Sequence, residues 1–339
     1  MTIHVANFKT MNNSISESDL KKISEISKII KQSKTFFIAG HVKPDGDSIG
    51  SALALKSVLT GIGKKAGVYC SDNIPLYLKF LKDVNKIKKS VKNNEIFDCA
   101  IILESVNFSR MGDIITPQQA KKIINIDHHV MFSNFGAVNY IVPDSSSTAE
   151  LVLNIFEHMK IKLTKDEAEC LYTGVVTDTG RFQQLNTTAN SHIAAAKLIE
   201  YGASPAYVRK QVYENNSLAS VKLLGSALSS MQTACNGKMA YMILTRDMFK
   251  KIGAKEDETE SIINFTMSVE GVKVGCIFKE VDKNTTKISF RSVKNFDVLE
   301  IVRKFGGGGH KNAAGCTINS NIKTSLEIMK KAFKEKLNA

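Results

Sequence analysis

The chain has 339 residues, and its 46 basic and 33 acidic side chains leave a formal charge of +13. Hydrophobic residues make up 43% of the chain and charged residues 23%, which is typical of a globular protein and excludes a disordered chain, a collagen-like repeat and a small disulfide scaffold. At roughly 100–200 residues per domain, this length predicts two domains, each able to bury its own core.

Predicted helices and strands alternate in the first part of the chain. Residues 16–33 carry isoleucines on one helical face, whereas 35–40 is a short apolar run that ends in glycine. The remaining predicted elements are strands at 68–70, 99–103 and 122–126 and helices at 48–60, 148–159, 164–176 and 188–201. This alternation predicts an α/β fold in which a mostly parallel sheet has helices on both faces.

The pattern changes after about residue 215. Strands are predicted at 239–245, 272–281 and 287–293, before a glycine-rich turn and a lysine-rich helix near 322–337. We therefore expect a first domain over residues 1–215, a linker helix over 216–235, and a smaller α/β domain with a mixed sheet over 236–339.

Cysteine usage and charge bear on the compartment and the partners. The six cysteines form no CxxC pair, and several lie in apolar runs, so we expect reduced core residues in a cytoplasmic protein. No apolar run approaches the roughly 18 residues that span a bilayer, and the N-terminus has no secretory pattern, so we expect no membrane partner. The positive charge would attract phosphates or nucleic acid, but it identifies neither.

The strongest local pattern follows the first predicted strand and reads His41-Val-Lys-Pro-Asp45-Gly-Asp47-Ser48. It places one imidazole and two carboxylates at the carboxyl end of a strand, which is the edge where ligands bind in open α/β sheets. Because Asp45 and Asp47 stand two residues apart in an extended loop, they could address different metal ions. Taken alone, the segment could also be a polar turn with a helix cap.

A second cluster, Asp127-His128-His129, follows the apolar strand at 122–126. Two adjacent histidines are hard to explain as packing, because burying them requires paired polar groups. His128 could ligate a metal while His129 contacts a substrate, with Asp127 orienting an imidazole.

Two further acidic side chains stand at the ends of apolar segments, Glu104 after a strand and Asp178 after a helix. Each alone is more typical of a structural turn. Together with the two clusters, however, they bring Asp, Glu or His from four element ends to one edge of the sheet. Carboxylates and imidazoles without thiolates favour Mn²⁺, Mg²⁺ or Fe²⁺ over a structural zinc, and two such ions about 3.5–4 Å apart would clamp a phosphoryl group.

The smaller domain contains a glycine run, Phe305-Gly-Gly-Gly-Gly-His310-Lys311. Consecutive glycines permit close approach of the backbone and let N–H groups turn toward an anion, although such a run is often only a flexible turn. Arg291 lies near the end of the strand predicted over 287–293, in a chain with only six arginines, and its guanidinium could bind a phosphate or stack on a base.

Taken in order, these motifs resemble those of the DHH phosphoesterase superfamily, which is named for an Asp-His-His triplet. The resemblance covers about residues 35–320 and includes the opening motif, the triplet at 127–129, the Asp-Thr-Gly at 178–180 and the GGGGHKNAAG of the DHH-associated C-terminal domain. The glycine-rich ending is similar to that of small two-domain enzymes that act as oligoribonucleases and as 3′-phosphoadenosine-5′-phosphate phosphatases.

The resemblance implies a catalytic DHH domain that holds two Mn²⁺ ions, with Mg²⁺ or another divalent cation as an alternative. The residues implied for one ion are His41, Asp45 and Glu104, and those implied for the other are Asp47, Glu104, His128 and Asp178. A hydroxide between the ions would attack phosphorus in line. His129, beside Asp127, would contact the scissile phosphate or assist the leaving group.

The resemblance also implies a set of substrate-binding residues, most of them in the DHH-associated domain. They are Arg110, Arg291, Gly307, Gly308, Gly309 and His310. One departure from the family stands in the metal site, where aspartate is usual and this chain has Glu104. The extra methylene would shift the carboxylate by about 1 Å, and a shift of that size at a catalytic site costs on the order of a hundredfold in rate.

We therefore expect a metal-dependent phosphoesterase that acts on short RNA or DNA oligonucleotides, on 3′-phosphoadenosine-5′-phosphate, or on both. A homodimer is one assembly that such an enzyme could form. One alternative is a phosphodiesterase for linear or cyclic dinucleotides of the pApA type. Another is a catalytically weak nucleotide-binding protein that Glu104 has disabled. A generic nucleic-acid-binding module is less favoured, because no aromatic platform accompanies the lysine-rich segments.

Overall fold

The computed structural model describes residues 15–92, 94–105, 107–130, 134–255, 259 and 262–338. The chain forms two compact units, residues 1–215 and 216–339. The α/β prediction is confirmed, since the first unit contains a five-stranded parallel sheet and the second a six-stranded mixed sheet. None of the helices in the described ranges is both long and apolar enough to cross a membrane.

The sheet of the first unit has the order β2-β1-β3-β4-β5. Its strands are β1 (Thr35–Ala39), β2 (Lys65–Tyr69), β3 (Cys99–Leu103), β4 (Ile123–Asp127) and β5 (Val138–Ile141). The chain builds outward from β1 to β2 on one side and to β3, β4 and β5 on the other. The switch point therefore lies between β1 and β3, where ligands bind at the carboxyl ends of the strands in folds of this kind.

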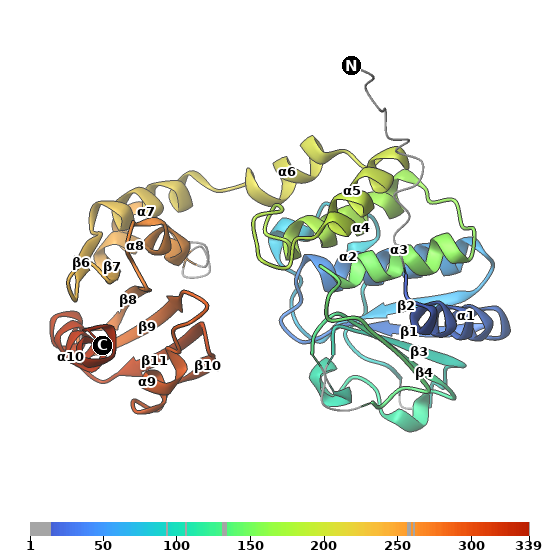
Figure 1. Cartoon of the computed structure of the whole chain (residues 1–339), viewed down its shortest axis with the longest axis horizontal. Helices are drawn as coiled ribbons and strands as arrows, with labels where there is room; N and C mark the ends of the chain where they lie inside the picture. Colours follow the sequence, from blue (N-terminus) through green and yellow to red (C-terminus); the bar gives the residue numbers. More distant parts are fainter. Residues whose placement is uncertain are drawn as a thin grey trace, which may run out of the picture. The chain divides into compact units, whose positions relative to one another are not determined.

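The α-helices of the first unit pack mainly on one face of this sheet (Figure 1). They are α1 (Glu17–Gln32), α2 (Gly46–Gly61), α3 (Thr148–His158), α4 (Lys165–Asp178), α5 (Ala189–Glu200) and α6 (Pro205–Tyr213). The opposite face is covered by Phe97 and by residues 108–120, which contain the short 3₁₀ helices η4 (Phe108–Met111) and η5 (Pro117–Gln119). In place of the helices expected on that face, the connection from β3 to β4 forms short 3₁₀ turns there.

Helices α2 and α4 pack against each other at two glycines, Gly50 and Gly174. A Cβ on Gly50 of α2 would stand 2.2 Å from the carbonyl oxygen of Cys170 in α4. A Cβ on Gly174 of α4 would stand 2.7 Å from Oδ1 of Asp47. Any larger residue would push the helices apart, so these glycines allow the start of α2 and the end of α4 to converge.

The second unit is a sheet of order β10-β11-β9-β8-β7-β6 with helices packed against it. Its strands are β6 (Gln232–Ala234), β7 (Met239–Leu244), β8 (Val274–Asp282), β9 (Thr285–Ser292), β10 (Gly308–His310) and β11 (Ala313–Ile318). Its helices are α7 (Leu218–Ser229), α8 (Arg246–Ile252), α9 (Leu299–Arg303) and α10 (Ile322–Asn338), with a 3₁₀ segment, η7, at Ile262–Ser268. The expected linker helix corresponds to α7, which packs its inner side into the core of this unit.

The glycine run differs from the turn expected there, because Gly308–His310 forms the terminal strand β10 and pairs with β11. A Cβ on Gly309, whose φ is +134°, would stand 2.5 Å from the carbonyl oxygen of Ala313. A Cβ on Gly307 would stand 2.3 Å from a methyl group of Val302, whereas one on Gly308 would meet nothing within 4 Å. Gly307 and Gly309 are therefore needed by the fold itself, and Gly306, with φ +69°, has a left-handed backbone that favours glycine, whereas Gly308 meets neither constraint.

Candidate metal centre

The predicted metal ligands converge at the carboxyl edge of the parallel sheet. His41 follows β1, Glu104 follows β3, and His128 follows β4. The start of α2 adds Asp45 and Asp47, and the last residue of α4 is Asp178. The four element ends proposed from sequence thus meet at the switch point of the sheet.

One group of ligands, which we call the His41 pocket, consists of His41, Asp45 and Glu104. His41 Nε2 lies 3.6 Å from Asp45 Oδ2 and 3.7 Å from Glu104 Oε2. His41 Nδ1 lies 2.7 Å from the carbonyl oxygen of Val42 and donates its proton to it, which leaves Nε2 as the free lone pair. Asp45 also caps α2, because its Oδ1 accepts hydrogen bonds from the backbone N–H groups at 47 and 48.

The second group, the His128 pocket, consists of Asp47, His128 and Asp178. His128 Nε2 lies 3.5 Å from Asp178 Oδ2, and His128 Nδ1 lies 3.3 Å from the carbonyl oxygen of Ser145. Asp47 is fully buried at the N-terminus of α3, where its two oxygens accept hydrogen bonds from Thr148 N at 2.6 Å and Ala149 N at 2.8 Å. These donors and the positive end of the helix dipole stabilise the buried carboxylate.

Glu104 links the two pockets. Its Oε2 faces His41, as given above, and its Oε1 lies 3.6 Å from His128 Nε2. The side chain is 1% exposed, and its backbone is left-handed with φ +51°. A non-glycine residue rarely adopts that conformation, and strain of this kind concentrates at functional sites. A single carboxylate thus stands between two imidazoles, as a ligand shared by two ions would.

The protonation behaviour of the cluster fits a cation. Burial and the nearby carboxylates raise the pKa of Glu104 well above its usual range, and they raise the pKa of Asp178 to about 8. Burial lowers the pKa of His128 and so favours the neutral imidazole that metals bind. His128 Nε2 and Glu104 Oε2 are buried without a hydrogen-bond partner in the described residues. A divalent ion would coordinate an unpartnered imidazole nitrogen and an unpartnered carboxylate oxygen of this kind.

Asp127 and His129 form a pair beside the metal ligands. Asp127 is fully buried, and its Oδ1 lies 2.8 Å from His129 Nδ1 and 2.9 Å from the His129 backbone nitrogen. This contact fixes a proton on Nδ1 and leaves Nε2 for another partner. The His129 side chain is 42% exposed, and its ring lies 4.4 Å from that of His128.

The expected substrate residues are distributed over both units. Arg110 lies in η4 of the first unit, where its carbonyl oxygen accepts a hydrogen bond from Val42 N. Burial and, to a smaller extent, the charge of Arg110 lower the pKa of His41, but the contacts with Asp45 and the Val42 carbonyl outweigh them, so the pKa is raised. Arg291 lies in β9 of the second unit and donates to the Phe290 carbonyl oxygen at 3.1 Å. The glycines of the run lie at β10 in the same unit, and the His310 side chain falls outside the described part of the structure.

The turn over residues 145–149 was missed as a functional element, since its sequence indicated only a helix start. It does begin α3, but it also supplies the Ser145 carbonyl to His128 and two backbone N–H groups to Asp47. No side-chain pattern could have signalled this role, because the groups involved belong to the backbone.

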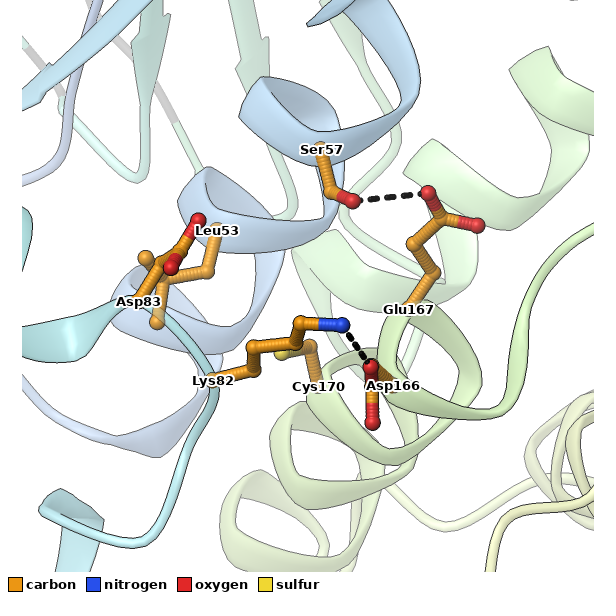
Figure 2. Close-up of a pocket in the computed structure, with 7 residues that line it drawn as sticks. All are labelled: Leu53, Ser57, Lys82, Asp83, Asp166, Glu167 and Cys170. Carbon is orange, nitrogen blue, oxygen red and sulfur yellow. Dashed lines mark hydrogen bonds and ion pairs between the residues drawn. The ribbon is translucent and has the colours of Figure 1, made fainter. Parts of the chain in front are cut away.

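A hollow in the first unit lies apart from this cluster (Figure 2). It is lined by Leu53, Ser57, Lys82, Asp83, Asp166, Glu167 and Cys170. Ser57 donates to Glu167 at 2.8 Å, and Lys82 forms an ion pair with Asp166. These polar groups already satisfy one another, so the hollow is a feature of the packing between α2 and α4.

Comparison with known proteins supports the interpretation of the cluster. Residues 35–175 match the DHH family, N-terminal domain, and residues 236–339 match the DHHA1 domain. The uncharacterized protein MG371 of Mycoplasma genitalium is 31% identical over 314 residues, which cover 89% of this chain and 92% of that one. The chain belongs to the DHH family. It is a DHH phosphoesterase by descent, with the DHHA1 domain as its second unit.

Two further similarities place it more closely within the DHH family. The bifunctional oligoribonuclease and PAP phosphatase NrnA of Thermus thermophilus is 29% identical over 319 residues, which cover 94% of each chain. The crystal structure of an exopolyphosphatase-related protein from Bacteroides fragilis matches with a TM-score of 0.85 and 27% identity, over 94% of this chain and 98% of that one. This DHH protein is thus related to NrnA over nearly its whole length.

Proposed function

We propose that the protein is a two-metal phosphoesterase that hydrolyses short oligonucleotides to mononucleotides, 3′-phosphoadenosine-5′-phosphate to AMP, or both. The observation that carries the proposal is the position of Glu104, whose carboxylate oxygens stand 3.7 Å and 3.6 Å from two imidazoles of different pockets. The similarity to NrnA supports the choice of substrates.

The proposed ion ligands are those of the two pockets. His41, Asp45 and Glu104 would hold one divalent ion, and Asp47, Glu104, His128 and Asp178 the other. Mn²⁺ is proposed first and Mg²⁺ second, following the resemblance to the family, and both ions suit carboxylate and imidazole ligands without thiolate. Ions bound there would activate water and neutralise charge on the phosphoryl oxygens.

The other residues of the first unit would position the substrate. His129 presents an exposed ring whose Nδ1 is tied to Asp127, so its Nε2 is available to a phosphoryl oxygen or a leaving-group oxygen. Arg110 lies near enough to His41 to affect its titration, and its guanidinium would bind a phosphate oxygen.

The second unit would bind the nucleotide end of the substrate. Gly308 is the residue of the run whose missing side chain the fold does not require, so its backbone is open to a ligand. Arg291, Gly307, Gly309 and His310 complete the proposed substrate-binding set. We further propose that the protein works in the cytoplasm, where its six free cysteines would remain reduced.

The test is product release from a 5′-labelled ladder of two- to twenty-four-residue oligonucleotides, run beside 3′-phosphoadenosine-5′-phosphate with Mn²⁺, Mg²⁺ or a chelator. We expect metal-dependent release of mononucleotides that declines with chain length. Hydrolysis of dinucleotides but of no longer oligonucleotide would instead indicate a pApA-type enzyme, and no hydrolysis of any substrate with Mn²⁺ present would overturn the proposal.

A further inference from the structure

Asn186 is the polar side chain that contacts Asp178 most extensively. Its Nδ2 lies 3.1 Å from Asp178 Oδ2, 3.2 Å from the Asp178 carbonyl oxygen and 2.9 Å from the Ser146 carbonyl oxygen. All three neighbours are acceptors, so the amide group must face them with its NH₂ end. Asn186 therefore donates hydrogen bonds both to a predicted metal ligand and to the turn that begins α3.

The turn that Asn186 contacts is the one that holds the other ligands of the His128 pocket. Ser145 accepts from His128, and the next backbone groups along the turn, those of residues 148 and 149, donate to Asp47. By joining Asp178 to the Ser146 carbonyl, Asn186 connects the third ligand to the support shared by the first two. All three ligands of this pocket are then braced against one segment.

The other end of the Asn186 amide argues against a role in packing alone. Asn186 Oδ1 is buried and has no hydrogen-bond partner in the described parts of the chain. A buried acceptor without a partner costs about 1–3 kcal/mol. An apolar side chain would avoid that cost, so the hydrogen bonds that the NH₂ group donates must offset it.

The chain between Asp178 and Asn186 is bent sharply enough to bring the two together. Gly180, Arg181 and Phe182 are consecutive left-handed residues, with φ of +54°, +64° and +62°. The two non-glycine residues are strained there, and contacts hold both: the Arg181 guanidinium lies 4.8 Å from the centre of the Tyr213 ring, and the Phe182 ring is stacked on His192 at 4.7 Å. This bend lies between Asp178 and Asn186, whose hydrogen bonds join its two ends.

We propose that Asn186 is a positioning residue that orients Asp178 toward the ion of the His128 pocket. This inference rests on the proposed two-ion function. Hydrogen bonds to a ligating carboxylate fix its orientation, and losing such a partner typically weakens metal binding by about 10–100-fold. The weakening should be confined to one of two ions, because Asn186 has no hydrogen bond to His41, Asp45 or Glu104 among the contacts of the described residues.

The test is calorimetric titration of Mn²⁺ into the metal-free full chain, comparing the wild type with Asn186→Leu. We expect two Mn²⁺ per wild-type chain, and in the variant one ion bound as before and the other bound about 10–100-fold more weakly. Asn139→Leu is the matched control. Asn139 is also half-buried in the first unit, and within the described residues the hydrogen bonds of its amide are to the backbone of Gly136.

A second measurement separates positioning from folding. The rise in Tm on adding Mn²⁺ should shrink in Asn186→Leu and stay unchanged in Asn139→Leu, even if both metal-free variants melt lower than the wild type. If Asn186→Leu folds poorly, Asn186→Ser replaces it, since serine is small and polar but too short to reach both Asp178 and the Ser146 carbonyl. Two ions bound by the variant with wild-type affinity would overturn this inference and leave the proposed function intact. A wild type that binds no Mn²⁺ would overturn both.

Discussion

The two ion pockets share Glu104, yet the protein builds them differently. In the His128 pocket, Asp47 is fully buried and is held by backbone donors about a hundred residues away in the sequence. In the His41 pocket, the Asp45 side chain is 45% exposed and its hydrogen bonds are to the first turn of its own helix. One pocket is therefore fixed by tertiary structure and the other by a local loop.

Two backbone hydrogen bonds also support the loop of the His41 pocket. Val42 N donates to the Arg110 carbonyl oxygen at 2.9 Å, and Lys43 N donates to Asp72 Oδ2 at 2.7 Å. These contacts hold the backbone of the loop rather than its ligating side chains. Because a preorganised site binds with less loss of conformational freedom, we expect the His128 pocket to bind its ion more tightly than the His41 pocket.

The largest effect should come from Asp47→Asn in the His128 pocket. An amide cannot accept both backbone hydrogen bonds through equivalent oxygens, and it is a poorer ligand for a hard cation. We expect hydrolysis to fall by about 10³-fold, as loss of several kcal/mol of transition-state stabilisation implies. Initial rates of dinucleotide hydrolysis with Mn²⁺, compared between the variant and the wild type, measure this loss.

Asp45→Asn is the matched change in the His41 pocket. Asparagine caps helices as well as aspartate does, so the fold should be unaffected. We expect a loss of activity that excess Mn²⁺ partly reverses, whereas the loss in Asp47→Asn should persist. Equal recovery in both variants would contradict the difference drawn between the pockets.

Glu104→Asp should have the next largest effect, since it alters the ligand that the pockets share. In this chain the longer side chain reaches between His41 and His128 from a left-handed backbone. Shortening it would withdraw the carboxylate by about 1 Å and lower kcat about 10–100-fold. A rise in kcat would instead favour a site that the glutamate has impaired.

Much of the fold and of the candidate site could be predicted from the sequence because the signals are local. The histidine and aspartates of residues 41–47 follow an apolar strand, and parallel strands bring such ends to one edge. The helices at 148–158 and 165–178 begin at a serine and a threonine that cap them, and the first differs from its predicted bounds only at its end.

What could not be predicted depends on contacts between distant segments. The hydrogen bonds from Thr148 N and Ala149 N to Asp47 come from backbone groups, which carry no sequence signature. Asn186 lies in a polar loop that reads as an ordinary turn, and only its three acceptors distinguish it. The glycine run suggested a turn because glycine has low strand propensity, yet the close approach of β11 makes it a strand.

A change of pH should have a smaller effect than these substitutions, and it acts through the buried carboxyls of the two pockets. The pKa of Asp178 is raised to about 8, and that of Glu104 is also raised. Between about pH 4 and pH 8, the folded metal-free protein therefore holds protons that the unfolded chain releases, so these groups lower its stability as pH rises. Ions must displace the same protons, so they bind more tightly as pH rises.

We accordingly expect the rise in Tm on adding Mn²⁺ to be larger at about pH 8.5 than at about pH 6. Differential scanning fluorimetry on protein first stripped with a chelator measures it. Asp178→Asn, which cannot titrate, should reduce the dependence on pH. An increment that is the same at both pH values would show that these carboxyls are already ionised at the lower one.

The smallest effect is expected in the second unit, from Gly308→Ala. Gly308 has open space where a Cβ would stand, so the substitution should leave Tm nearly unchanged. If a substrate approaches this backbone, the added methyl group should raise KM a few-fold. Losing about 1 kcal/mol of binding free energy weakens affinity roughly fivefold. Gly309→Ala is the contrasting variant, since its Cβ would collide with the Ala313 carbonyl in a conformation that alanine avoids. It should lower Tm. A Gly308→Ala protein with unchanged KM for oligonucleotides would remove this glycine from the substrate site, since nothing in the fold would mask the effect.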